Sequence, residues 1–169
     1  MYTPSETAEI CNKKGVEKVK KSLGPKLLLG FIGGAMISLG YVAYMKIVAT
    51  TPEALSFLGT FLGAAVFPIG LVVILLAGGE LVTGNMVAVS LAWLNKKIRW
   101  QEMVSNWLVI TLANFIGAVF VAFFFGHVVG LTGQGAYLHE LLVVADAKLA
   151  ATPLQAFVSG IGCNWFVGL

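Results

Sequence analysis

The stretch AGGELVTGNM, from Ala77 to Met86, places polar side chains inside one of the most apolar regions of the chain. Glu80 supplies a carboxylate, Thr83 a hydroxyl and Asn85 an amide. An ionisable group at membrane depth is costly to bury and usually belongs to a pathway for ions or protons. The alternative is a structural Glu80 that accepts hydrogen bonds from backbone amides freed by a broken helix. Both interpretations predict an interruption of the helix at this point.

The composition places this stretch in a membrane protein. Hydrophobic residues make up 58% of the chain and charged residues 11%, and the mean hydropathy is +0.89. A soluble domain normally carries about 25% charged residues. We therefore predict an integral membrane protein whose main solvent is the lipid bilayer. The net charge of +3 comes from basic segments near helix ends, and no motif for binding nucleic acid is present.

The residues that serve enzymes and metal sites are sparse and scattered. Cys11 and Cys163 stand alone, so neither a disulfide framework nor a metal site is predicted. His127 falls in an expected span and His139 in an outer connection, and we interpret both as structural. A membrane enzyme is the alternative class, but it would need ligand-spaced His or Cys or a nucleophile–base pair. We expect no metal, no cofactor and no catalytic residue.

Apolar runs divide the chain into a leader and four expected spans. A spanning helix needs about 20 mostly apolar residues. Residues 1–26 form a polar, amphipathic leader, and spans are expected at 27–48, 57–93 and 104–131. Residues 132–153 are expected as a loop on the extracellular side, and a fourth span starts at 154 and continues to 169.

Basic residues set the expected orientation. The leader holds six lysines before Leu27, and the connection after Trp93 holds Lys96, Lys97 and Arg99. The connection around Glu53 has no basic residue. Cytoplasmic connections carry the excess of Lys and Arg. We therefore expect a multi-pass protein of the inner or plasma membrane with its N-terminus in the cytoplasm.

The second span is too long for one straight crossing. A continuous helix over 57–93 would extend roughly 55 Å, against a hydrocarbon core of about 30 Å. Two full crossings would place the basic connection after Trp93 on the side of Glu53, against the charge pattern. We therefore predict one crossing, broken near 79–85. Non-helical backbone at this depth must be buried in protein or line a water-filled cavity.

Three long motifs resemble the formate/nitrite transporter family. They are FPIGLVVILLAGGELVTGNM (67–86), NWLVITLANFIGAVF (106–120), and ADAK (145–148) followed by GIGCNWFVGL (160–169). The resemblance covers nearly the whole chain. It implies an aquaporin-like bundle of six helices in two inverted three-helix repeats, assembled as a homopentamer with one pore in each protomer. It also implies that the second helix is interrupted by an Ω-shaped loop.

The resemblance also implies roles for individual residues. Leu71, Leu81 and Val82 fall at the cytoplasmic constriction, although many formate-type members have phenylalanine at the position of Val82. The other implied residues are Phe67 with Asn164 and Val167 at the outer constriction, Thr83 and Lys148 at the centre, and Glu80, Gly84 and Asn85 as loop support.

Each of these roles has a simpler alternative. Leu71, Leu81 and Phe67 are residue types that commonly face lipid or the protein core. Lys148 could be a solvated loop lysine, and Thr83 could cap the helix that resumes after the break. The motif match alone raises these positions above that background.

The expected function is a channel, passive or proton-coupled, for small monovalent weak-acid anions such as formate, nitrite or hydrosulfide. The chain stops within the expected fourth helix, whereas the family's central pore histidine lies on the fifth. The resemblance therefore implies a C-terminally truncated part of the six-helix fold. The alternative is a non-conducting membrane scaffold or a truncated subunit of a larger channel.

Overall fold

The computed structural model describes residues 2–167, and every regular element in that range is a helix. The α-helices are α1 (Pro4–Lys20), α2 (Leu23–Thr50), α3 (Ser56–Val66), α4 (Ile69–Ala77), α5 (Val82–Leu94), α6 (Trp100–Val121), α7 (Gly135–Leu149) and α8 (Pro153–Val167). A 3-10 turn, η1 (Glu53–Leu55), precedes α3, and a π-helix, η2 (Ala122–Val128), continues α6. The predicted all-helical class is therefore confirmed.

Three helical stretches are long and apolar enough to cross a membrane: Leu23–Thr50, Glu53–Ala77 and Trp100–Val128. Their outward side chains are large and apolar, and Phe57 and Leu76 are each 84% exposed. Water would penalise such a surface, whereas lipid does not. The expected span 27–48 lies within α2, and most of 104–131 lies within α6 and η2.

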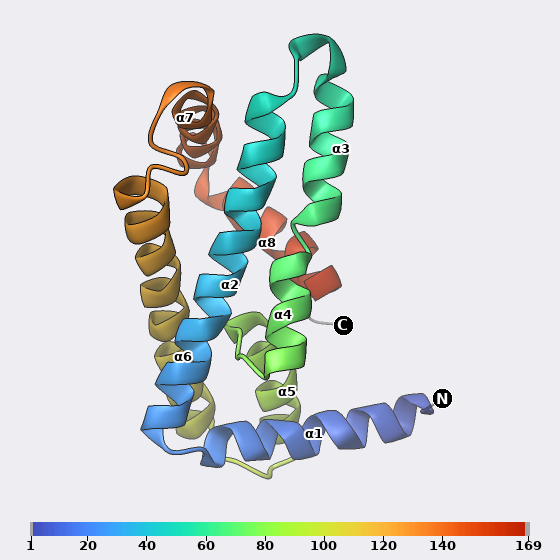
Figure 1. Cartoon of the computed structure of the whole chain (residues 1–169). Coiled ribbons are helices and arrows are strands. Elements are labelled where there is room, and N and C mark those ends of the chain that lie inside the picture. The colour runs from blue at the N-terminus through green and yellow to red at the C-terminus, as the bar shows by residue number, and fades with distance from the viewer. Residues whose placement is uncertain (1, 168–169) are drawn as a thin grey trace.

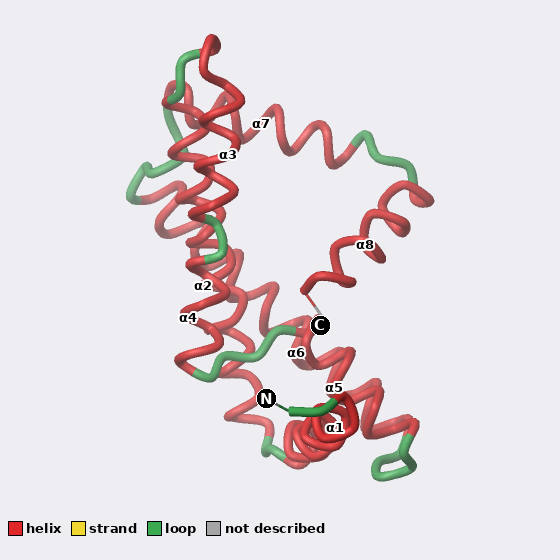
Figure 2. The backbone as a smooth tube through the Cα atoms, turned by 90° about the vertical axis from the view of Figure 1, so that its right-hand side faces the viewer, coloured by secondary structure: helices red, strands yellow, loops and turns green. Residues whose placement is uncertain are grey.

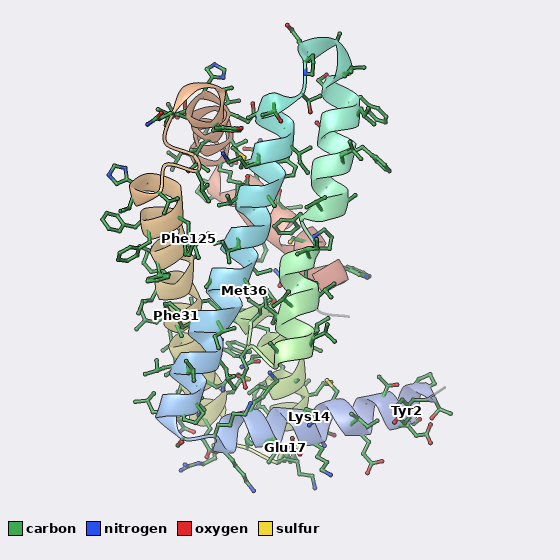
Figure 3. The ribbon with its side chains drawn as sticks, in the orientation of Figure 1. Tyr2, Lys14, Glu17, Phe31, Met36 and Phe125 are labelled. Carbon is green, nitrogen blue, oxygen red and sulfur yellow. The ribbon has the colours of Figure 1, made fainter. Side chains whose placement is uncertain are left out.

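Helices α2 and α6 form the centre of the bundle. Glycines let their backbones meet, since a Cβ at Gly34 would collide with the backbone of Asn114. Ile110 is fully buried, and Phe31 packs edge-on against Phe120 with ring centroids 5.3 Å apart. Close contact between small residues replaces the hydrophobic driving force that is missing inside lipid. Figure 3 shows Phe31 on α2, on the side toward α6.

Helix α1 lies across one end of the bundle, below α2 in Figure 1. It begins at a capping box in which Thr3 and Glu6 bond to each other's backbone amides. It packs on α5 and touches α6. Its exposed part carries an ion pair between Lys14 and Glu17, 3.0 Å apart (Figure 3). The leader is therefore a docked helix.

The segment after η1 is broken twice. Helices α3, α4 and α5 follow one another along the bundle (Figure 1). The first break is at Phe67 and Pro68. The sequence analysis did not predict this break, although a proline marks it. The second begins at Gly78, whose left-handed backbone (φ 81°) ends α4. The second break ends at Leu81. Residues 82–85, which were expected in the break, instead form the start of α5.

The segment 132–153, expected as a loop, contains the 15-residue helix α7. This expectation was wrong because the glycines around position 133 mark only the turn before the helix. Helices α7 and α8 meet at 108°. Figure 2 shows α7 running outward from the bundle and α8 turning back toward its middle. This return brings the end of α8 to the second break.

Candidate functional site

A cavity of about 130 Å³ lies beside the second break in the interrupted span. Five parts of the chain contribute its wall: α1, α4, the break itself, the start of α5 and the end of α8. Most of the lining is apolar, with one hydroxyl and one ammonium group. The residues are Lys18, Leu71, Ile74, Leu75, Gly79, Leu81, Thr83, Gly84 and Val167.

The break explains how one short segment reaches this cavity from several directions. Helix α4 presents Leu71 and Ile74 one turn apart, and the chain then leaves the helix at Gly78. Leu81 is extended (φ −110°, ψ 140°) and points its side chain into the same space. The new helix begins at Val82, so Thr83 follows in its first turn. A continuous helix would place these side chains around its circumference.

The structure brings five of the sequence-predicted site residues to the cavity and leaves the other six away from it, two of which, Glu80 and Asn85, are described below. Leu71, Leu81, Thr83, Gly84 and Val167 line it, whereas Val82, Phe67, Asn164 and Lys148 do not.

The residues away from the cavity have other surroundings. Phe67 lies at the first break and packs edge-on against Tyr41, with centroids 6.2 Å apart. The exposed Asn164 donates to the carbonyl of Gly160 in its own helix. Lys148 is exposed near the end of α7. In the part of the chain that the structure describes, these three residues do not lie at one site.

Thr83 carries a hydroxyl of unusual status. Its oxygen is buried, and no described residue is within hydrogen-bonding geometry of it. Helix α5 is capped at Leu81 without a side-chain hydrogen bond, so the alternative role of Thr83 as a cap is wrong. A buried polar atom without a partner costs free energy unless a water or ligand supplies one. The hydroxyl is therefore free to bind a molecule in the cavity.

Glu80 is almost completely buried, with 1% of its surface exposed. Its carboxylate accepts hydrogen bonds from the ammonium of Lys21 and from the amide of Asn85 (3.0 Å). The Lys18 ammonium lies 3.8 Å from the second carboxylate oxygen. The carboxylate therefore joins the break to α1, and it does not bond the loop's own amides as the structural alternative assumed.

Asn85 extends this arrangement to α6. Its amide oxygen accepts from the Lys18 ammonium at 2.7 Å, and its amide nitrogen donates to Asn106 at 2.9 Å. The Asn106 side chain in turn donates to the backbone carbonyl of Lys18 at 3.4 Å. Both asparagines are fully buried. Because each polar group has a partner, this network can lie inside the bundle without a large desolvation cost.

Lys18 is the charged residue of the cavity wall that the sequence analysis did not predict. It reaches the cavity from α1, and its position in a polar leader gave no sign of a buried partner. Burial lowers the pKa of its ammonium, while the charge of Glu80 raises it and Lys21 lowers it further. Two lysines share one buried carboxylate, so this end of the cavity has an excess of positive charge.

The cavity thus combines apolar walls, one hydroxyl and one ammonium group. Such a site suits a small anion that has lost most of its water, because the cation and the hydroxyl replace part of its hydration shell. No group of three His, Cys, Asp or Glu residues suitable for a metal ion occurs among the described residues.

Comparison with known proteins agrees with this class of helical membrane protein. The sequence profile of the formate/nitrite transporter family matches residues 5–169, so the chain belongs to that family. It is similar to the uncharacterized transporter YrhG of Bacillus subtilis (46% identity over 98% of this chain and 62% of that protein). It is also similar to the formate channel BtFdhC of Bacillus thuringiensis (45%, 99% and 64%) and to the formate channel FocA of Haemophilus influenzae (29%, 98% and 58%). The chain spans slightly less than two thirds of the length of these relatives.

Proposed function

We propose that the complete protein is a channel for small monovalent weak-acid anions, and that formate is its main substrate. The observation that carries this proposal is the cavity at the second break, where Leu71 and Leu81 face a cation and an orphan hydroxyl. The names of two relatives, both formate channels, support the choice of formate. Nitrite and hydrosulfide share its size and charge and are the other candidates.

The apolar wall provides selectivity. An anion that enters a space lined by leucines loses hydration that those side chains cannot replace, at a cost of several kcal/mol. Chloride has no way to reduce this cost by accepting a proton. The anion of a weak acid can accept a proton and pass as the neutral acid. We therefore propose that flux is faster at acidic pH, where more of the acid is protonated.

The polar groups provide attraction. The Lys18 ammonium raises the local concentration of anions at the end of the cavity near α1. The Thr83 hydroxyl donates a hydrogen bond to a carboxylate oxygen, which partly replaces a lost water. Lys148 retains its proposed role as a second cation, and Phe67, Asn164 and Val82 retain theirs at the constrictions, as proposals that rest on family resemblance.

The test is anion flux into proteoliposomes that contain the full-length gene product. Formate, nitrite, hydrosulfide and chloride are compared from acidic to neutral pH, with protein-free liposomes as the control for direct diffusion of the neutral acids. We expect protein-dependent flux of one weak acid that rises as pH falls, with little chloride flux. Equal flux of chloride, or no flux above that of protein-free liposomes, would refute the proposal.

A further inference from the structure

The side chain of Asn114, on α6, holds the second break by its backbone. Its amide nitrogen donates to the carbonyl of Glu80 at 2.8 Å and to the carbonyl of Gly30 at 2.7 Å. Its amide oxygen accepts from the backbone N–H of Val82 at 3.0 Å. One side chain therefore contacts the residue before Leu81, the residue after it, and α2.

Asparagine is the residue type that this geometry requires. The three contacts need two donated hydrogens and one accepted hydrogen bond at the end of a short side chain, and a neutral amide supplies both kinds. Backbone groups in a break have no helical partners and must find others at this depth. Aspartate has nearly the same shape but, when ionised, it only accepts hydrogen bonds.

Helix α2 is shaped to admit this contact. A Cβ at Gly33 would collide with the carbonyl of Glu80, and a Cβ at Gly34 would collide with the backbone of Asn114. A further backbone bond, from the N–H of Glu80 to the carbonyl of Leu29 at 3.0 Å, fixes the break against α2. The backbone on either side of Leu81 is thus held from both α2 and α6.

This arrangement is separate from the network around the Glu80 carboxylate. That network attaches side chains of the break to α1, whereas Asn114 bonds only to main-chain groups. The side chain of Leu81 lines the cavity, so the position of its backbone sets how far it reaches into the space.

We propose that Asn114 is a positioning residue that sets the aperture at Leu81 and thereby the discrimination between weak acids and hydrated ions. The proposal rests on the channel function proposed above. Asn114 does not line the cavity, and it acts on the substrate only through Leu81. Its effect therefore appears in selectivity.

The test compares Asn114→Asp with wild type in the full-length gene product. The matched control is Asn95→Asp, because the exposed Asn95 bonds to the carbonyl of Leu91 in its own helix. We expect the ratio of chloride to formate flux to rise about thirtyfold in Asn114→Asp, the factor that corresponds to losing roughly two ordinary hydrogen bonds. We expect no change in Asn95→Asp. An unchanged ratio in Asn114→Asp would overturn the proposal.

A second variant covers the case in which aspartate prevents assembly. Asn114→Gln keeps the donors and the acceptor but moves them by one methylene, so we expect it to assemble and to raise the same ratio by a smaller factor. Wild-type selectivity in an assembled Asn114→Gln protein would overturn the proposal.

Hydrogen exchange separates this proposal from the channel function on which it rests. We expect backbone amides of residues 79–83 to exchange faster in both Asn114 variants than in wild type, whether or not any anion crosses the membrane. If wild type shows no flux but both variants exchange faster, the channel function is rejected. The role of Asn114 in holding the second break is then retained. Faster exchange with wild-type selectivity would show that Asn114 is structural only.

Discussion

Thr83 has a hydroxyl that the protein buries and does not satisfy. A structural threonine normally finds a backbone carbonyl, as Thr51 does with Ile47 at 2.8 Å. Thr83 instead lies in the cavity wall with Leu81 and Gly84, where its hydroxyl can meet a molecule in the cavity. We therefore propose that Thr83 contributes to binding more than to stability.

Replacing Thr83 with valine separates these two contributions. The substitution keeps the shape of the side chain and removes a hydroxyl that has no protein partner, so we expect the melting temperature to stay within about 2 °C of wild type. We expect formate flux to fall about fivefold, since one hydrogen bond to the substrate is worth roughly 1 kcal/mol. Flux in proteoliposomes and thermal unfolding in detergent measure the two effects.

Thr51→Val is the matched control for this experiment. It removes a hydroxyl that is hydrogen-bonded within the protein and far from the cavity lining, so we expect it to lower the melting temperature and leave flux unchanged. The binding role of Thr83 would be contradicted if Thr83→Val lowered stability as Thr51→Val does and conducted normally.

At the scale of elements, α1 lies on the surface of the bundle and holds the second break through contacts with its side chains. Lys18 lies on α1 and Lys21, three residues later, is its C-cap residue, so both ammonium groups reach Glu80. Asn85 and Asn106 complete the connection to α5 and α6. The leader therefore belongs to the structure of the site.

Neutralising Glu80 should release α1. In Glu80→Gln the two lysines lose their shared carboxylate, and we expect the free energy of unfolding to fall by about 2–3 kcal/mol, below the range for a fully buried pair because Lys21 is partly exposed. Limited proteolysis should cut the leader faster than in wild type.

Glu17→Gln is the control, since it removes an exposed ion pair with Lys14, and solvent screening leaves such pairs with little effect on stability. We expect its stability and its proteolysis to match wild type. Equal effects of the two substitutions would show that the buried pairing does not hold α1.

The elements also show what the sequence could predict. Hydropathy predicted the apolar helices α2 and α6, and glycines predicted the start of the second break, because both signals are local. The partners of the break are not local: Lys18 meets Asn85 across 67 positions, and Asn114 meets Gly30 across 84. No spacing rule links such residues, so Lys18, Asn106 and Asn114 were missed while their partners Glu80 and Asn85 were found. Lys148 and Asn164 were named from family resemblance alone, and the described chain leaves both exposed.

At the scale of the whole molecule, the apolar surface exceeds what the bundle buries. Large side chains on α4 and α8 remain open, among them Leu76 at 84% and Phe157 at 68% exposure. Helix α8 makes few contacts with the rest of the chain, and its main neighbour is α5. Lipid or further protein must cover these faces in the membrane.

We predict that further copies of the protein cover part of this surface and that the full-length gene product forms a homopentamer. Chemical cross-linking in mild detergent should give a ladder that ends at five subunits, and denaturation with sodium dodecyl sulfate before cross-linking should abolish it. A ladder that ends at one or three subunits would contradict the predicted assembly.

The contacts of α1 also impose an order on biosynthesis. The leader leaves the ribosome before its partners, since the carboxylate that pairs with Lys21 is translated 59 residues later and Asn106 later still. Until those residues have entered the membrane, the lysines of the leader have no buried partner and remain in water. Docking of α1 is therefore a late event, and it takes place only after the interrupted span and α6 have been inserted.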